Sequence, residues 1–535
     1  MRQPFTADNL ASSSAQLDER TRGAPSAPLR GRWYSASLLG VILVIATAGL
    51  VYELALATVA SYLLGDTVTQ FSLVIGVYLS ALGIGAYLSK FFIADLTLTF
   101  VRLEFSTALL GGSSAIGLEL CFSVGAPIRL LLLMSVLVIG VLVGLELPLL
   151  MRILESRMSF RELVARALGF DYAGALIGSI GFSIWMLPHW GLGRTTLICG
   201  LLNAFVGMLS TWLLNVESPR EARELRHSRW VGAFIIALLS LALYHAESLA
   251  RLGENQRYGR INEAIQSSYQ RIVLTEHQDS LDLFLNGRLQ FSSTDEQRYH
   301  EALVHPVLSA ADGTRRVFVG GGGDGLAARE ILKWPSVESI TLVDIDPIMT
   351  HLAKTNTRLA QLNRRSLLDS RVTVINDDAM GYLERSKQRF DVILLDFPDP
   401  TQLALGKLYS TRFYSAVREH LEPGGAVGVQ CTSPLLTRRS FWSIITTLEA
   451  VGLYVIPYRA FVPSFGDWGF AVARIEPFAY PSIPLSVRLK TLDDRSFAAL
   501  TDMPFDTQRV SARANRLDDQ ALVATYSNEA ARFEQ

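Results

Sequence analysis

Aspartates follow apolar runs at several points in the second half of the chain, and their positions suggest chemistry. They are Asp324, Asp344, Asp378, Asp396 and Asp399. Each run is typical of a buried strand, and in an open parallel sheet ligands bind where the carboxyl ends of the strands meet. We therefore expect these carboxylates to converge on one crevice, where they would attract a cationic molecule and take up a proton during a reaction.

A glycine-rich turn precedes the first of these aspartates. The apolar residues 317–319 lead into four consecutive glycines, including Gly321 and Gly323, and then into Asp324 and a helix-forming segment. Glycines at such a turn let the backbone approach a ligand closely and accept positive φ values. Asp344 follows about twenty residues later, where an acid can accept hydrogen bonds from a ribose diol. The combination predicts a nucleoside site, with a purely structural turn as the alternative.

The nucleoside is expected to be cationic. Asp324 lies where a dinucleotide would place its pyrophosphate, and a carboxylate there repels phosphate and attracts positive charge. S-adenosylmethionine and its decarboxylated form carry a sulfonium and an amine but no phosphate. The residues therefore favour an S-adenosyl donor over a dinucleotide.

Residues 266–475 resemble the spermidine synthases, which are polyamine aminopropyltransferases, in several motifs besides the glycine turn. These motifs are Ser268-Tyr269-Gln270, residues 285–290, residues 294–301, His305-Pro306, residues 408–410, Phe413-Tyr414 and Trp468-Gly469-Phe470. Their combination is more specific than any one of them. The resemblance implies an α/β Rossmann-like domain of the S-adenosylmethionine-dependent transferase type with a small β cap before it.

The resemblance also implies a role for each candidate residue. Asp396 would be the catalytic residue. Substrate contacts would come from Asp324, Asp399, Tyr299, His300 and Gln270. Nucleoside contacts would come from Gly321, Gly323, Asp344, Asp377 and Asp378.

The reaction implied is transfer of an aminopropyl group from decarboxylated S-adenosylmethionine, a co-substrate, to a polyamine such as putrescine, with release of methylthioadenosine. The resemblance implies no metal and no bound cofactor. Phe397-Pro398 between two of the acids, and Lys407 in the loop that follows, depart from the family pattern and leave the acceptor and the form of the donor open. Two other functions remain alternatives: another S-adenosylmethionine-dependent transferase, and a polyamine transporter or sensor with a non-catalytic nucleoside-binding domain.

The first half of the chain has the composition of a membrane domain. The chain is 50% hydrophobic with a mean hydropathy of +0.27. Seven apolar stretches lack a clear polar face, and most are long enough to cross a bilayer. They are residues 35–63, 71–92, 107–124, 130–150, 165–187, 195–214 and 230–244. An α-helical transmembrane bundle with six to eight spans is expected.

The distribution of basic residues predicts the orientation of this bundle. Arginines concentrate in the N-terminal tail and in residues 152–166 and 220–229, which places the N-terminus in the cytoplasm. Seven crossings would then put the transferase part outside, away from its donor. We expect a multi-pass protein of the cell (inner) membrane with a cytoplasmic catalytic domain, so either residues 230–244 lie at the interface or an eighth crossing exists.

Acids occur inside the predicted spans. Glu53, Glu119, Glu146 and Asp171 could line a path for polyamine cations, or they could hold the helices together by hydrogen bonds, aided by close packing at Gly174 and Gly178. The second interpretation is favoured. The formal net charge of −1 does not indicate a nucleic-acid partner, and the three cysteines are too far apart to suggest a metal or disulfide site.

The domain organisation follows from these patterns. We expect a disordered tail over residues 1–34, a transmembrane domain over 35–247, a small β-domain over 262–306, a Rossmann-like domain over 307–490 and a C-terminal extension over 491–535. The expected partners are a polyamine, an S-adenosyl donor, the lipid bilayer and, as an open option, a second copy of the chain in a homodimer.

Overall fold

The computed structural model describes most of the chain. The described residues are 29–64, 67–155, 159–214, 218–250, 260–277, 280–479 and 487–532. Most of the predicted N-terminal tail lies outside them, although the first helix already begins at Leu29. These residues form a helical part and an α/β part, which are described separately.

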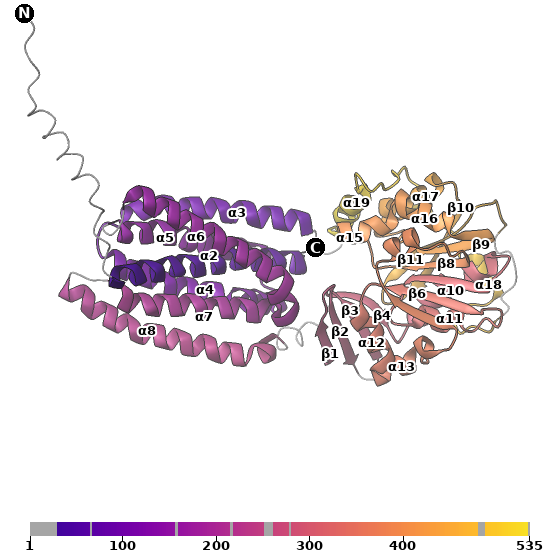
Figure 1. Cartoon of the computed structure of the whole chain (residues 1–535). Helices are drawn as coiled ribbons and strands as arrows, with labels where there is room; N and C mark the ends of the chain where they lie inside the picture. The colour runs from indigo at the N-terminus through magenta and orange to yellow at the C-terminus, as the bar shows by residue number, and fades with distance from the viewer. Residues whose placement is uncertain are drawn as a thin grey trace, which may run out of the picture. The chain divides into compact units, whose positions relative to one another are not determined.

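The helical part consists of long apolar helices that lie side by side (Figure 1). They are α2 (Leu29–Leu64), α3 (Thr67–Leu88), α4 (Leu96–Ser123), α5 (Ile128–Leu154), α6 (Phe160–Gly181), α7 (Leu187–Leu213) and α8 (Pro219–Tyr244). Six helical stretches are long and apolar enough to cross a membrane, by length and composition. Each predicted apolar stretch overlaps one of these helices, but the stretch 71–92 continues past the end of α3, and α4 begins well before the predicted Thr107.

The longest of the six stretches, Phe160–Leu213, contains a break. It spans 54 residues, which as one straight helix would measure about 80 Å, far more than a bilayer core. A π-helical turn at Phe182–Met186 joins α6 to α7, and Gly191 has a left-handed φ of 73° with an extended ψ of 176°. The break divides the stretch into two helices, so the helical part contains as many helices as the sequence predicts apolar stretches.

Small residues let these helices pack closely. A Cβ on Gly174 would lie 2.5 Å from the backbone oxygen of Leu43, and one on Gly178 would lie 2.8 Å from that of Thr47. The Thr47 hydroxyl also donates a hydrogen bond to the Gly174 carbonyl at 3.0 Å. The predicted close approach at these two glycines is confirmed, and it joins α6 to α2.

The α/β part begins with a four-stranded antiparallel sheet. Its strands are β1 (Ile261–Gln266), β2 (Arg271–His277), β3 (Ser280–Leu285) and β4 (Arg288–Ser292), in that order. The inward residues of β2 and β3 are buried in the same core as helix α10 (Glu296–Ala310). This sheet is the β cap that the sequence predicts.

A seven-stranded mixed sheet forms the centre of the α/β part, in the order β10-β11-β9-β8-β5-β6-β7. Its strands are β5 (Arg316–Gly321), β6 (Ser339–Asp344), β7 (Val372–Asn376), β8 (Phe390–Asp396), β9 (Leu421–Gln430), β10 (Tyr454–Val462) and β11 (Gly466–Arg474). Strands β5 to β9 are parallel, and β10 and β11 are antiparallel to their neighbours. The strands predicted from the apolar runs that lead to Asp324, Asp344, Asp378 and Asp396 are confirmed as β5, β6, β7 and β8.

Helices cover both faces of this sheet (Figure 1). On one face Val317 and Val319 pack with α10, α11 (Leu326–Ile331), α12 (Pro347–Thr355) and α13 (Thr357–Leu362). On the other face Phe318 packs with α14 (Ala379–Arg385), α16 (Thr411–Glu419) and α17 (Arg438–Ala450). The short α15 (Leu403–Gly406), α18 (Asp494–Ala499) and α19 (Ala521–Ala530) complete the fold. The alternation along β5 follows the two-residue period of a strand with two buried faces.

Candidate active site

The strand order reverses between β5 and β8, and this point positions the site. The first strand of the parallel set lies between β6 on one side and β8 on the other. Register pairs Gly321 with Asp396 and Gly320 with Val343, which directly precedes Asp344. Ligands bind in open α/β sheets at such a reversal, beyond the carboxyl ends of the strands.

This turn needs glycines because neighbouring atoms approach its backbone closely. Gly321 has a φ of 81°, and a Cβ on it would lie 2.2 Å from the backbone oxygen of Asp396. A Cβ on Gly323 would lie 2.6 Å from the Asp344 carboxylate. A larger residue at Gly321 would displace Asp396, and a larger residue at Gly323 would displace Asp344.

Asp396 ends strand β8 and is held by a tyrosine. The Tyr299 hydroxyl, on α10, donates a 2.7 Å hydrogen bond to Oδ1 of Asp396. Burial raises the pKa of Asp396 above its ordinary value, although the charge of His300 and this hydrogen bond act in the opposite direction. The carboxylate lies deep in the fold and still keeps part of its surface exposed, as a group that exchanges a proton with a substrate must.

His300 serves the site as a buried cation. Its Nδ1 lies 2.8 Å from the Glu296 carbonyl and 2.9 Å from Glu296 Oε2, so Nδ1 must carry a proton. Burial alone would lower the pKa of His300, but the hydrogen bond and charge of Glu296 outweigh it and raise the pKa to about 9. The positive charge faces Asp324 and Asp396, whose pKa values it lowers. His300 therefore places a positive charge beside these two carboxylates, and its direct contact with the substrate stays a prediction.

A buried ion network supports this histidine. Arg329 donates to both Glu296 carboxylate oxygens at 2.8 Å and to Glu330 at 3.0 Å. Glu330 also lies 2.9 Å from Nε2 of His305. The sequence indicates the motifs around Glu296 and His305 but gives no sign of their pairing, because Arg329 and Glu330 come from the helix after the glycine turn.

Asp324 lies in the glycine turn at the start of α11. Its Oδ1 accepts a 2.8 Å hydrogen bond from the Leu326 amide, and Asn363 donates to its carbonyl at 2.8 Å. Burial raises the pKa of Asp324 to about 6, against the lowering effect of the His300 charge. A cationic ligand beside it would favour the ionised form.

Asp344 ends strand β6 and faces the glycine turn. Its two oxygens accept backbone hydrogen bonds from Gly323 at 3.0 Å and Asp346 at 2.9 Å. Burial raises the pKa of Asp344 to about 6 despite these two bonds. Each oxygen keeps a lone pair for a further donor such as a ribose hydroxyl.

Gln270 connects the β cap to the nucleoside side of the crevice. Its amide donates to Asp346 Oδ2 at 3.0 Å, and the Ser267 hydroxyl donates to the same oxygen at 2.7 Å. Asp346 also caps helix α12 through Ile348. The sequence does not single out Asp346. This residue follows strand β6 of the larger sheet, and its carboxylate holds Gln270, which belongs to the β cap.

Asp377 and Asp378 follow strand β7, and both carboxylates already have partners. Asp377 forms an ion pair with Arg385. Asp378 accepts from the Gly381 amide at 2.9 Å and pairs with Lys407 Nζ at 2.7 Å. Lys407 thus approaches the predicted adenine contact rather than the acids Asp396 and Asp399. An adenine amino group would have to share Asp378 with Lys407 or displace it.

Asp399 lies beyond Asp396 and is held by a residue from the end of the chain. The Tyr526 hydroxyl, on α19, donates a 2.6 Å hydrogen bond to Asp399 Oδ2. Within the described residues, Asp399 Oδ1 is buried without a hydrogen-bond partner. Burial raises the pKa of Asp399, and the Tyr526 hydrogen bond, the positive charge of Arg288 and the neighbouring Gln430 amide partly offset this effect. No sequence signal points to Tyr526, because it lies in the predicted C-terminal extension.

Comparisons with known proteins identify relatives of this chain. The family model described as "Spermine/spermidine synthase domain" matches residues 296–479. A polyamine aminopropyltransferase of Leptospira interrogans serogroup Icterohaemorrhagiae serovar copenhageni is 44% identical over 489 residues, which cover 91% of this chain and 97% of the relative. Polyamine aminopropyltransferase 2 of Ralstonia nicotianae is 43% identical over 500 residues, which cover 92% of this chain and 98% of the relative. The chain belongs to the polyamine aminopropyltransferase family.

A solved structure of a spermidine synthase in complex with the transition-state analogue AdoDATO also aligns with this aminopropyltransferase. The alignment has a TM-score of 0.44 and 26% identity, and it covers 46% of this chain and 86% of that chain.

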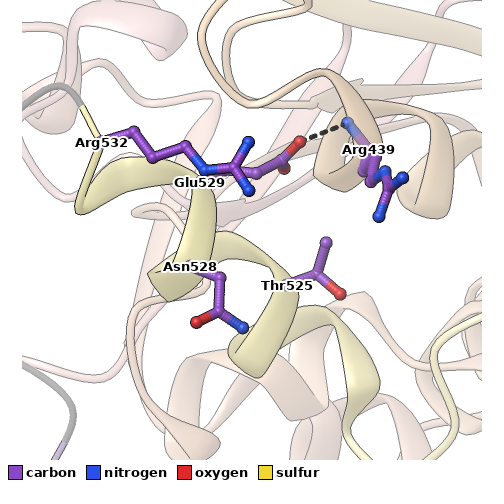
Figure 2. Close-up of a pocket in the computed structure, with 5 residues that line it drawn as sticks. All are labelled: Arg439, Thr525, Asn528, Glu529 and Arg532. Atoms are coloured by element: carbon purple, nitrogen blue, oxygen red, sulfur yellow. Dashed lines mark hydrogen bonds between the residues drawn. The ribbon is translucent and has the colours of Figure 1, made fainter.

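A surface pocket lies beside the site of this aminopropyltransferase, where α19 meets α17. It has a volume of about 540 Å³ and is lined by Arg439, Thr525, Asn528, Glu529 and Arg532 (Figure 2). Glu529 accepts hydrogen bonds from the Arg439 amide at 2.9 Å and the Ser440 amide at 3.0 Å, so it caps the start of α17. None of the strand-end carboxylates lines this pocket, which marks the docking of α19 rather than the reaction centre.

Proposed function

We propose that this transferase moves an aminopropyl group from decarboxylated S-adenosylmethionine to an amine nitrogen of a polyamine such as putrescine. The two relatives described above are named polyamine aminopropyltransferases and align along nearly their whole length. The observation that carries the proposal is the grouping of Asp324, Asp396 and Asp399 around one strand reversal, which suits a donor and an acceptor that both carry positive charge.

The reaction follows from the charges. The free amine nitrogen of the acceptor attacks the carbon next to the sulfonium, the carbon–sulfur bond breaks, and methylthioadenosine leaves with the electron pair on sulfur. The nitrogen then holds a positive charge and loses a proton, which Asp396 is placed to accept. An alkylamine has a pKa near that of lysine, about 10.4, so the site must also favour the neutral amine before attack.

Tyr299 and His300 prepare Asp396 for this step. The tyrosine fixes one carboxylate oxygen, and the positive charge of His300 opposes the effect of burial on the pKa of Asp396, which favours the ionised carboxylate. Asp324 would hold the amine of the donor, Asp344 the ribose and Asp378 the adenine. Asp399 would bind the acceptor. Alignment of the two reactants accounts for much of the acceleration in reactions of this kind.

Product analysis tests the proposal directly. The purified full chain is incubated with decarboxylated or intact S-adenosylmethionine, each with and without putrescine. We expect methylthioadenosine and an aminopropylated amine only with the decarboxylated donor and putrescine together. A methylated product from the intact donor would instead support another S-adenosylmethionine-dependent transferase. Binding of donor and amine without any product would support a sensor.

We also propose that the helical part anchors the enzyme in the cell membrane and that the catalytic part faces the cytoplasm. The apolar helices support the anchoring, and the supply of the S-adenosyl donor supports the cytoplasmic side. Helix α8 packs within the bundle, because a Cβ on Gly232 would meet the Phe105 ring of α4 at 2.4 Å. This packing favours an eighth crossing over an interfacial α8 as the explanation that makes the arginine distribution compatible with a cytoplasmic catalytic domain.

A further inference from the structure

Helix α19 contributes to the acceptor side of the active site although it lies outside the matched synthase domain. That domain ends at residue 479, whereas Tyr526 donates the 2.6 Å hydrogen bond to Asp399. Tyr526 is only 6% exposed, so its ring fills space beside Asp399. We propose that α19 is a wall of the acceptor pocket and that Tyr526 is a positioning and specificity-determining residue for the amine acceptor. This inference rests on the proposed function.

Three contacts hold α19 in place. Asn515, which is fully buried, accepts a hydrogen bond from the Leu522 amide of α19 at 3.2 Å and donates to the carbonyls of Gly406 at 2.9 Å and Tyr409 at 3.2 Å. Val523 packs so closely on Gly406 that a Cβ there would lie 2.4 Å away. Glu529 caps α17, as Figure 2 shows. The loop after Asp399 and the helix that carries Tyr526 are therefore fixed to each other.

The hydrogen bond from Tyr526 leaves Asp399 ready for a cation. It occupies Oδ2 and orients the carboxylate, while the buried Oδ1 has no partner in the described part of the chain. An ammonium group has three N–H donors, and a charge-assisted bond to Oδ1 would satisfy one of them. The ring of Tyr526 would at the same time limit the length of the amine that fits.

The test compares Tyr526→Phe with Thr525→Ala, a neighbouring change whose side chain lines the pocket of Figure 2. In Tyr526→Phe the KM for putrescine should rise about tenfold, which corresponds to about 1.4 kcal/mol, while the donor dissociation constant stays the same. The acid limb of kcat/KM for putrescine should move to higher pH, because loss of the Tyr526 hydrogen bond raises the pKa of Asp399, while Arg288 and Gln430 continue to lower it. Thr525→Ala should change neither quantity.

Tyr526→Ala adds a second readout, because it removes the ring and should raise the preference for spermidine over putrescine. Unchanged putrescine KM, pH profile and amine preference in both Tyr526 variants would overturn the inference. If the wild-type chain transfers no aminopropyl group, the proposed function fails, and calorimetric titration with putrescine still tests the contact. Equal putrescine affinity in wild type and Tyr526→Phe would then reject it.

A different observation concerns the interior of the helical bundle, where acids lie without basic partners. Glu104 on α4 is 0% exposed, and neither carboxylate oxygen has a hydrogen-bond partner among the described residues. Glu146 on α5 is 1% exposed and accepts a 3.0 Å hydrogen bond from Thr107, one turn after Glu104. The buried residues described in the bundle include no lysine, arginine or histidine. An unpaired buried charge is costly and marks a functional site by default.

Unpartnered neutral groups face the same place. On α7, Gly200 packs on Ala108 and Gly207 packs on Glu104, so Asn203 between them lies on the side of α7 that faces α4. Asn203 is fully buried, and neither its amide oxygen nor its nitrogen has a partner in the described structure. The ring of Tyr52 lies against Gly111 on α4, and its hydroxyl is likewise buried and unpartnered among the described residues.

We propose that Glu104, Glu146, Asn203 and Tyr52 form a buried site for a protonated alkylamine. Two carboxylates with amide and hydroxyl oxygens match the three N–H donors and the charge of an ammonium group. No group of three acidic, histidine or cysteine ligands in the described residues suits a metal ion. The proposed function supplies the ligand class, since polyamines carry such groups.

Binding of labelled spermidine to the full chain in nanodiscs tests this site. The catalytic acceptor site is first silenced by Asp396→Asn with Asp399→Asn. We expect saturable binding to remain and its affinity to fall about tenfold or more in Glu104→Gln and Glu146→Gln, and also in Asn203→Ala. Glu53→Gln, a change at another buried acid of the bundle, is the matched control. An unchanged helical circular-dichroism spectrum and an unchanged thermal unfolding midpoint of the full chain in nanodiscs verify that the bundle of each variant is folded.

Three results would overturn the bundle site. They are no spermidine binding after the catalytic site is silenced, residual binding that the bundle variants leave unchanged, and proton uptake without amine binding. The turnover assay on the wild-type chain judges the proposed function separately, so the two can fail independently.

Discussion

At the scale of single residues, we expect Asp396 to carry the chemical step. Asp396→Asn keeps the size of the side chain and the contact to Tyr299 but removes the proton acceptor. We expect the rate to fall by about 10²–10⁴, with donor affinity close to that of the wild type. Single-turnover kinetics and calorimetry with methylthioadenosine measure the two quantities. Near-normal turnover would remove Asp396 from the proposed role.

The pH dependence reports on the same group of acids. Burial raises the pKa of Asp324 and of Asp344 to about 6, so both lose their negative charge as the pH falls through that value. The kcat/KM for the donor should therefore fall below about pH 6. His300→Gln removes a buried positive charge beside Asp324 and Asp396, and it should move the acid limb up by roughly one pH unit. An acid limb at the same pH in wild type and variant would contradict the role given to His300.

The sequence predicted these acids because the carboxyl ends of parallel strands share an edge, and strand ends can be read from apolar runs. The partners of the acids could not be predicted. Tyr526 reaches Asp399 only through the path of the chain after β11, and Lys407 points to Asp378 because of where α15 turns. Glu104 was missed for a local reason: the charges of Arg102 and Glu104 made the predicted span begin at Thr107.

At the scale of elements, the turn between β5 and α11 is the most constrained part of the site. Gly321→Ala would place a Cβ on a residue with positive φ, 2.2 Å from the Asp396 carbonyl. We expect a loss of about 1–3 kcal/mol in the free energy of unfolding and a large loss of activity, because Asp396 must move. Gly313→Ala is a suitable control, since its Cβ would meet only Asp391 at 3.5 Å. Chemical denaturation measures both, and equal stabilities would contradict the expectation.

The elements themselves were largely predictable. Strands β5 to β8 and the long helices have uniform apolar patterns over their whole length, and these patterns depend little on the rest of the chain. The antiparallel pair β10 and β11 and the terminal helix α19 were not specified, because their positions depend on partners distant in sequence. The break at Gly191 could also not be predicted from the sequence, since the apolar composition continues through it.

At the scale of the whole molecule, the α/β part should fold without the helices. Residues 260–532 contain both sheets and the two hydrophobic cores that cover the faces of the larger one. We expect a fragment beginning at Arg260 to be soluble and monodisperse and to bind methylthioadenosine as the full chain does. Size-exclusion chromatography and calorimetry measure this. Aggregation of the fragment even with a solubility partner would show that the helices cover part of its surface.

Topology is the second prediction at this scale. Reporter fusions after Val216 and at Gln535 should both give a cytoplasmic signal if the arginine-rich loop and the catalytic part share one side. Because α7 and α8 are separate helices packed in one bundle, this outcome requires a further crossing between the fusion points or an α8 that does not span. A periplasmic signal at Gln535 would reject the cytoplasmic placement of the enzyme.

The hydrogen bond between Tyr526 and Asp399 joins positions 127 residues apart, and the glycine turn and strands β5 to β8 all precede both of them in the chain. If α19 sets the amine acceptor as proposed, mutations that change the acceptor could accumulate in this helix while the glycine turn and the strand-end acids stay the same. Evolution of new acceptor preferences in such enzymes would then leave its record at the end of the chain. Variant libraries restricted to α19 would then be a practical way to change the acceptor specificity of the enzyme towards unnatural diamines.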